Sequence, residues 1–273
     1  KDALGFMYGQ TCGTMQPHKE GSPLLGMQIG FNARGALQAI DLTKAGFKGP
    51  HDVIDGKYGY LRLIEKDQFN LDKIWKLMGR EWQVSRLSHK PFPSGRLTHG
   101  VIDALQQITS ELNITSSEIT KVECYVPPLV YNLVGRPNIP SPEPNYAKLC
   151  LKFVAGAWLA KKRVSLAEFA SVEILSDKDI HSEAKKIEIF KDQNDDLNAL
   201  DPQKFSIFLS DGTKHEVLLN NMIGHFKKPL TNEQNIEKFF HCLGHSNANF
   251  SKQQGHQIMD FIDRIESKVN VAE

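Results

Sequence analysis

The feature that most limits how this chain can fold is a change in the spacing of its apolar residues. Over residues 96–112 they recur at helical spacing, whereas residues 121–126 alternate as a strand does. Residues 205–219 form two strand-like runs around an Asp-Gly pair, which is typical of a β-hairpin turn. After Pro229 the helical spacing returns. This order predicts a mixed fold, in which an all-α helical domain is interrupted by an inserted α+β domain.

The same pattern sets the expected domain boundaries. We predict a helical domain over residues 1–86, the α+β domain over residues 87–227, and a return to helices over residues 228–273. Within the first part, residues 31–44 predict a helix rich in small side chains that ends at Gly46. Small residues let another backbone approach closely, so we expect this helix inside a helical bundle.

Shorter segments complete the predicted secondary structure. Thr231 and Gln234 have the spacing of a capping box at the start of a helix. The first nine residues are typical of a helix interior, so we expect the chain to start partway through a larger protein. Further helices are predicted at 52–54, 71–78, 146–160 and 256–269, an extended link at 82–84, and strands or strand–helix transitions at 171–175 and 186–190.

Charge and composition exclude several classes of partner. Lys plus Arg is 33 and Asp plus Glu is 32, so the formal net charge is only +1. A nearly neutral chain has no overall field that attracts nucleic acid or acidic lipid, and we predict neither partner. No apolar run of membrane-spanning length is present. An anionic ligand must therefore be recognised by local groups.

Cysteine and histidine spacing gives no sign of a metal centre. His241 and His245 are four residues apart, but the zinc-protease motif needs a glutamate where Cys242 stands, so we expect no metal. Widely spaced cysteines without a CxxC pair favour a reduced, intracellular compartment. The four cysteines are Cys12, Cys124, Cys150 and Cys242.

The strongest candidate for chemistry is the segment KPFPSGRLTH at residues 90–99. Its prolines hold the backbone extended before a helix begins, and the first amides of a helix attract anions. Lys90 and Arg96 add positive charge, and His99 can transfer protons near neutral pH. These groups predict a pocket for a carboxylate or phosphate. The alternative is a rigid connector in which Ser94 caps the helix and the basic side chains are solvated.

Several segments, in order along nearly the whole chain, resemble the MmgE/PrpD family. One of them pairs the KPFP segment with a following H-x-x-[IV]-D-A pattern, in which the histidine is His99. The others are MQIGFNARG at 27–35, AGFKGP at 45–50 with DGKYGY at 55–60, the helix at 147–157, and KPLT at 228–231. The resemblance implies a helical domain with an inserted α+β lid, and a site between the two.

The resemblance also implies an activity, namely a lyase of the dehydratase or decarboxylase type, or an isomerase. Such enzymes abstract a proton next to a carboxylate of a small di- or tricarboxylate, without metal or organic cofactor. By resemblance, Lys90 and His99 line the site, with Ser94, Gly95 and Arg96 nearby. We assign proton transfer to His99 and carboxylate binding, or a second acid/base role, to Lys90, and these roles are interchangeable at this stage. The family also implies a homodimer in the cytoplasm, or in the mitochondrial matrix of a eukaryote.

Departures from the family pattern leave two alternatives open. Leu25 and Phe153 stand where family members often have a lysine and an aromatic hydroxyl. Gln28, a predicted substrate-binding residue, stands where many have histidine or another polar residue. Loss of two proton carriers puts dehydration in doubt. The chain is then a catalytically inactive carboxylate-binding or structural member of the fold, or a subunit completed by a separate N-terminal polypeptide.

Overall fold

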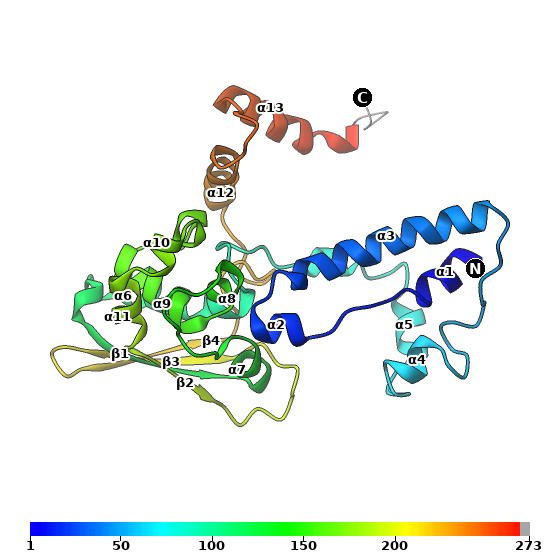
Figure 1. Ribbon diagram of the computed structural model, residues 1–273. Coiled ribbons are helices and arrows are strands. Elements are labelled where there is room, and N and C mark those ends of the chain that lie inside the picture. The colour runs from blue at the N-terminus through cyan, green and yellow to red at the C-terminus, as the bar shows by residue number, and fades with distance from the viewer. Residues whose placement is uncertain (268–273) are drawn as a thin grey trace.

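The structure, a computed structural model, describes residues 1–267 and combines helices with one small mixed sheet (Figure 1). The predicted mixture of helices and sheet is thus confirmed, whereas the insertion of an α+β domain into a helical domain stays a prediction. The helices before the sheet are α1 (Asp2–Tyr8), α2 (Gln16–Glu20), α3 (Leu24–Lys44), α4 (Tyr60–Leu63), α5 (Leu71–Leu77) and α6 (His99–Glu111), with the short 3-10 turns η1 (Gln83–Arg86) and η2 (Arg96–Thr98) between the last two. The later helices are α7 (Pro128–Val134), α8 (Pro144–Lys148), α9 (Leu151–Lys161), α10 (Val172–Leu175), α11 (Lys178–Ala184), α12 (Asn232–Gly244) and α13 (Lys252–Asp263).

The sheet has four strands in the order β2-β1-β3-β4. They are β1 (Ile119–Val126), β2 (Ile187–Lys191), β3 (Gln203–Leu209) and β4 (Lys214–Leu219). Strands β1 and β2 are parallel, whereas β1–β3 and β3–β4 are antiparallel, and the last pair is the predicted Asp-Gly hairpin. Helices gather on one face of the sheet (Figure 1). Alternate residues of β1, such as Val122 and Cys124, are fully buried under them.

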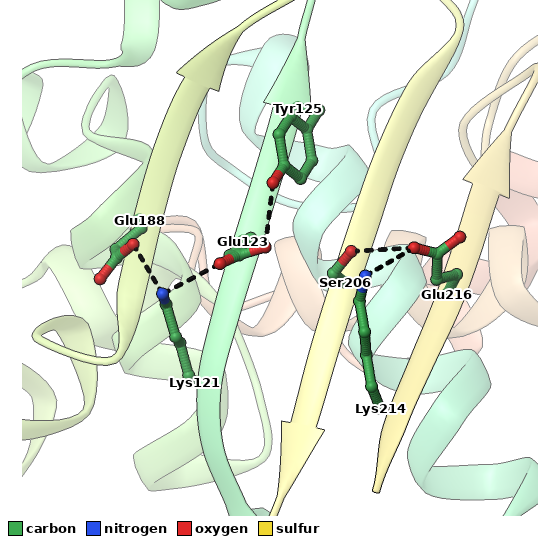
Figure 2. A network of polar contacts seen from close by, with 7 residues as sticks. All are labelled: Lys121, Glu123, Tyr125, Glu188, Ser206, Lys214 and Glu216. Atoms are coloured by element: carbon green, nitrogen blue, oxygen red, sulfur yellow. Dashed lines mark hydrogen bonds and ion pairs between the residues drawn. The ribbon is translucent and has the colours of Figure 1, made fainter.

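The opposite face of the sheet carries a band of compensating charges (Figure 2). Lys121 bridges Glu123 at 2.9 Å and Glu188 at 3.0 Å. Lys204 and Lys214 each lie 2.8 Å from a carboxylate oxygen of Glu216. These two lysines lower the pKa of Glu216 to about 2. This face is therefore polar, solvated and locally neutral.

The core between the sheet and the helices that cover it depends on a close contact between α9 and α11. Helix α9 is buried almost all round, as its run of apolar residues predicts. A Cβ placed on Gly156 would overlap the carbonyl oxygen of Ile180 and lie 2.8 Å from the backbone nitrogen of Ala184. Only glycine lets the two helices approach this closely. The large side chains with under 2% exposure include Ile102, Phe153, Phe205 and Met222, and the whole set lies between His99 and Met222.

The helices at the two ends of the chain pack more loosely than this core. Helix α3 begins seven residues before the predicted start and contacts α1 along one face. Helices α12 and α13 project away from the sheet and the helices that cover it (Figure 1), and each begins with a capping box. The expected bundle around α3 is not present among residues 1–267, because large apolar side chains of α3 such as Ile29 remain 74% exposed.

Three short predictions were wrong. Residues 172–175 form a helix rather than a strand, because the Ser171 hydroxyl caps the first turn by accepting from the backbone N–H of Ile174. Residues 83–86 form a 3-10 turn, and residues 52–54 are turns rather than a helix. The last helix is α13, and the predicted end at 269 lies outside the described residues.

Within residues 1–267, no helix has the length and apolarity needed to cross a membrane. The four cysteines are unpaired, with Cys124 and Cys150 buried and Cys12 and Cys242 exposed. The boundaries of a separate lid domain and the compartment stay predictions.

Candidate active site

The loop that carries the predicted site is fixed at both ends by backbone hydrogen bonds. The N–H of His89 donates to Gly224 at 2.8 Å, and the N–H of Gly95 donates to Lys148 at 2.7 Å. A Cβ on Gly95 would lie 2.8 Å from a side-chain methyl group of Leu149, so the loop packs closely against this leucine. Ser94 does not cap the helix directly, because its hydroxyl is buried against that of Thr98 at 2.9 Å.

His99 lies behind this loop rather than in an open site. Its side chain is fully buried and packs edge-to-face against Phe92, with ring centroids 5.3 Å apart. Burial lowers the pKa of His99 to about 3, and the charges of Lys90 and Arg96 add to the shift while the Ser94 backbone opposes it. Neither ring nitrogen has a hydrogen-bond partner of good geometry among residues 1–267. The imidazole is therefore neutral at physiological pH.

Arg96 and Gln28 also serve the fold. Burial lowers the pKa of Arg96, and the negative charge of Asp201 opposes this shift. Burial in turn raises the pKa of Asp201. Gln28 holds the preceding loop onto α3, because its side chain accepts from the N–H of Thr14 at 2.8 Å and donates to the carbonyl of Thr14 at 3.3 Å. Neither side chain lines the main cavity of the described residues.

That cavity has a volume of about 640 Å³ and lies between the loop, the end of α9 and one side of α12. Lys90 is the one predicted site residue that lines it. Positive side chains from the other two elements join Lys90, namely Lys162, Arg163 and Lys238. The walls are mainly apolar, formed by Phe92, Trp158, Val164, Leu166, Ile223 and Leu230.

The four cations differ in how far they are already neutralised. Arg163 pairs with the buried carboxylate of Glu168 at 2.7 Å. Lys162 lies 4.5 Å from the ring centre of Trp158, and burial lowers its pKa. Within the described chain, no ion pair holds Lys90, Lys162 or Lys238, and Glu237 is the one carboxylate in the lining. A cavity lined by three ammonium groups outside any close ion pair and by a single carboxylate favours a negatively charged ligand.

His241 is the imidazole that lines the cavity. It projects from α12, and its ring lies 4.5 Å from that of His245, whose Nδ1 faces the His241 carbonyl at 2.9 Å. Residues 1–267 hold no group of three or more His, Cys, Asp or Glu arranged for a metal ion. From the sequence alone, His241 was considered only as a zinc ligand, and nothing in the local sequence linked His241 or Lys162 to Lys90.

An ion pair between the buried Asp103 and the partly exposed Lys228 sets the position of α12 beside the loop. Lys228 donates to both carboxylate oxygens of Asp103, at 2.7 and 2.9 Å. Asp103, on α6, also accepts from the backbone N–H of Ile223 at 2.8 Å and from Gln107 at 2.9 Å. The chain segment that leads into α12 is thereby tied to the helix that follows the loop.

We expect Lys228→Met to lower the free energy of unfolding by about 2 kcal/mol, because it leaves the buried carboxylate of Asp103 without its counter-ion. Urea unfolding measures the change. Lys227→Met is the matched control, since the neighbouring lysine is exposed, and it should change stability by less than about 0.5 kcal/mol. Equal stability of the two variants would contradict this role for the ion pair.

Comparison with known proteins agrees with this architecture. The family model for the MmgE/PrpD C-terminal domain matches residues 92–264, so the chain belongs to the MmgE/PrpD family. Mouse (Mus musculus) cis-aconitate decarboxylase is 26% identical over 260 residues, which is 90% of this chain and 48% of the mouse protein. The chain thus spans about half the length of this relative.

Proposed function

We propose that this chain forms part of a lyase of the dehydratase or decarboxylase type that acts on a small di- or tricarboxylate. The observation that carries the proposal is the gathering of Lys90, Lys162 and Lys238 around one apolar-walled cavity. Membership of the family and the similarity to a decarboxylase of a tricarboxylic acid support the same class of reaction.

The proposed chemistry needs a base and a set of cations. Removal of a proton from the carbon next to a carboxylate places negative charge on that carboxylate, and nearby ammonium groups stabilise it. We assign carboxylate binding to Lys90 and Lys238. We assign proton transfer to His241, because this residue lines the cavity, whereas His99 is buried against Phe92. Ser94, Gly95 and Arg96 then position the loop, and substrate binding by Gln28 stays a prediction.

A specific observation favours a second candidate, a carboxylate-binding protein without catalysis. Phe153 stands where the family resemblance implies an aromatic hydroxyl, and it is fully buried, with ring centres 6.0 Å from Phe169 and 5.8 Å from His181. This position therefore supplies packing and no proton. Binding without turnover is the outcome that distinguishes this candidate from the lyase.

We expect Lys90→Ala and Lys238→Ala each to weaken binding of cis-aconitate or citrate by about tenfold, which corresponds to about 1.4 kcal/mol. Calorimetric titration measures the affinities, and NMR of the same mixtures detects turnover. Lys185→Ala, an exposed lysine at the end of α11, is the control and should bind as the wild type does. His241→Gln should keep binding and lose turnover. Wild-type protein that binds neither acid would contradict both candidates.

A further inference from the structure

One aromatic side chain separates the main cavity from a buried polar group. Phe92 lines the cavity, and its ring also packs edge-to-face on the ring of His99, with centroids 5.3 Å apart. His99 is fully buried and does not itself line the cavity. Burial lowers the pKa of His99 most, and the charges of Lys90, Arg96 and Lys238 add to the shift. Because two of these three, the lysines, line the cavity, the cavity lies within electrostatic reach of the buried ring. Phe92 is therefore both a wall of the cavity and the cover of His99.

His99 has hydrogen-bonding groups that the present arrangement does not use. A neutral imidazole carries one donor and one acceptor nitrogen, and buried polar atoms are nearly always hydrogen-bonded. Neither ring nitrogen of His99 has a partner of good geometry among residues 1–267. The hydroxyls of Ser94 and Thr98 are bonded to each other at 2.9 Å instead. A ligand that reached the imidazole would satisfy a group that is now buried without a partner.

The segment that carries the cover is attached mainly at its ends. Residues 90–94, which we call the strap, lie between the backbone hydrogen bonds of His89 and Gly95 described above. In the part of the chain that the structure describes, no backbone–backbone hydrogen bond involves residues 90–94. Pro91 and Pro93 have no N–H to donate, and their rings restrict the backbone. The strap is therefore stiff along its length and able to move as one piece about its two ends.

We propose that Phe92 is a gate, and that a carboxylate ligand in the cavity opens it by displacing the strap from His99. This inference rests on the proposed function, because it needs a carboxylate that binds Lys90. The Nζ of Lys90 lies 3.4 Å from the carbonyl oxygen of Ser94, so a ligand that binds this ammonium competes with a contact inside the strap. In the open form, the N–H of His99 donates to a ligand oxygen. The closed form cannot make this bond, and a ligand shifts an equilibrium only through such a difference between two forms.

The alternative is a fixed wall, in which Phe92 never leaves His99 and the imidazole only fills the core. A fixed wall predicts that truncation of Phe92 weakens ligand binding, because an apolar contact is lost, and that His99 has no effect on binding. The gate predicts the opposite sign for Phe92. Loss of its ring removes the closed form that competes with the ligand, so a larger fraction of the protein is ready to bind.

Acylation of histidine by diethyl pyrocarbonate, measured by mass spectrometry, tests the cover without a ligand. We expect Phe92→Ala to make His99 react roughly tenfold faster than in the wild type, because the ring no longer covers it. Leu166→Ala is the matched control, since it truncates another apolar wall of the same cavity, and His99 should stay slow in it. Gly156→Ala, a destabilised variant outside the strap, should also leave His99 slow, which separates opening of the gate from unfolding. Equal rates in Phe92→Ala and the wild type would overturn the gate.

Calorimetric titration with citrate tests the response to a ligand. Phe92→Ala should bind citrate roughly threefold more tightly than the wild type. His99→Leu, which keeps an apolar side chain of similar size, should bind it about tenfold more weakly. Weaker binding by Phe92→Ala, with no loss in His99→Leu, is the fixed-wall result and would overturn the gate.

Nitrogen-15 NMR of the imidazole rings distinguishes failure of the gate from failure of the proposed function. The His99 signal is identified by its loss in His99→Gln, and we expect it to shift when citrate saturates the wild type. Citrate that binds the wild type but leaves this signal unchanged would overturn the gate and leave the proposed function standing. A wild type that binds no citrate would overturn both.

Discussion

Lowering the pH from 7 to 5 should decrease the free energy of unfolding of the wild-type protein by about 2 kcal/mol more than that of a His99→Gln variant. The folded state holds the pKa of His99 at about 3, far below the ordinary value of 6.5. Between these two values the unfolded chain binds a proton that the folded chain does not. The neutral buried ring therefore makes its full contribution to the free energy of unfolding above pH 6.5. That contribution decreases by about 1.4 kcal/mol per pH unit as the pH falls from 6.5 toward 3.

Urea unfolding of both proteins at several pH values measures this difference directly. Carboxylates such as Glu216, whose pKa is lowered to about 2, also respond to acid, but they are common to both proteins and cancel in the comparison. Parallel stability curves for wild type and His99→Gln would show that the imidazole is accessible to protons in the folded state. That result would make His99 a candidate for proton transfer again.

Gly156→Ala should lower the free energy of unfolding by about 2–3 kcal/mol, although it adds a single methyl group. The added Cβ would overlap the Ile180 carbonyl and crowd the backbone nitrogen of Ala184, so α9 and α11 must separate. Backbone atoms inside a helix cannot move aside as a flexible side chain does. The same separation opens the core beneath the sheet, because both helices take part in it.

The matched control is Gly244→Ala, which adds the same methyl group in α12 with no atom within 4 Å. Alanine favours helix over glycine by up to about 1 kcal/mol, so this variant should be as stable as the wild type or slightly more so. Chemical unfolding followed by circular dichroism compares the two variants. If both lose the same stability, the close contact between α9 and α11 is not what requires glycine at position 156.

Local patterns predicted the central elements of the fold well, because those elements are specified by their own sequences. The alternation in β1, the Asp-Gly turn before β4 and the capping box at Thr231 each need only a few neighbouring residues. Residues 172–175 misled the prediction because a run of four mainly apolar residues suits a short strand equally well. There the Ser171 cap decided the outcome.

The candidate site was only partly predictable, for a different reason. Lys90 was found because the loop and the following helix are contiguous in sequence. Lys162, Lys238 and His241 reach the same cavity from distant segments, and the Asp103–Lys228 ion pair that helps to bring α12 there is invisible in local spacing. For His99, the sequence showed the neighbouring charges but gave no sign of burial behind Phe92.

The confinement of the largest fully buried side chains to the stretch from His99 to Met222 has an evolutionary consequence. Selection for thermodynamic stability acts mainly on that stretch, where a lost methylene is felt at once. Selection for core packing acts less on the helices before His99 and after Met222. Substitutions there are retained or lost according to the contacts that those helices make. The central stretch and the helices that flank it are thus expected to diverge at different rates.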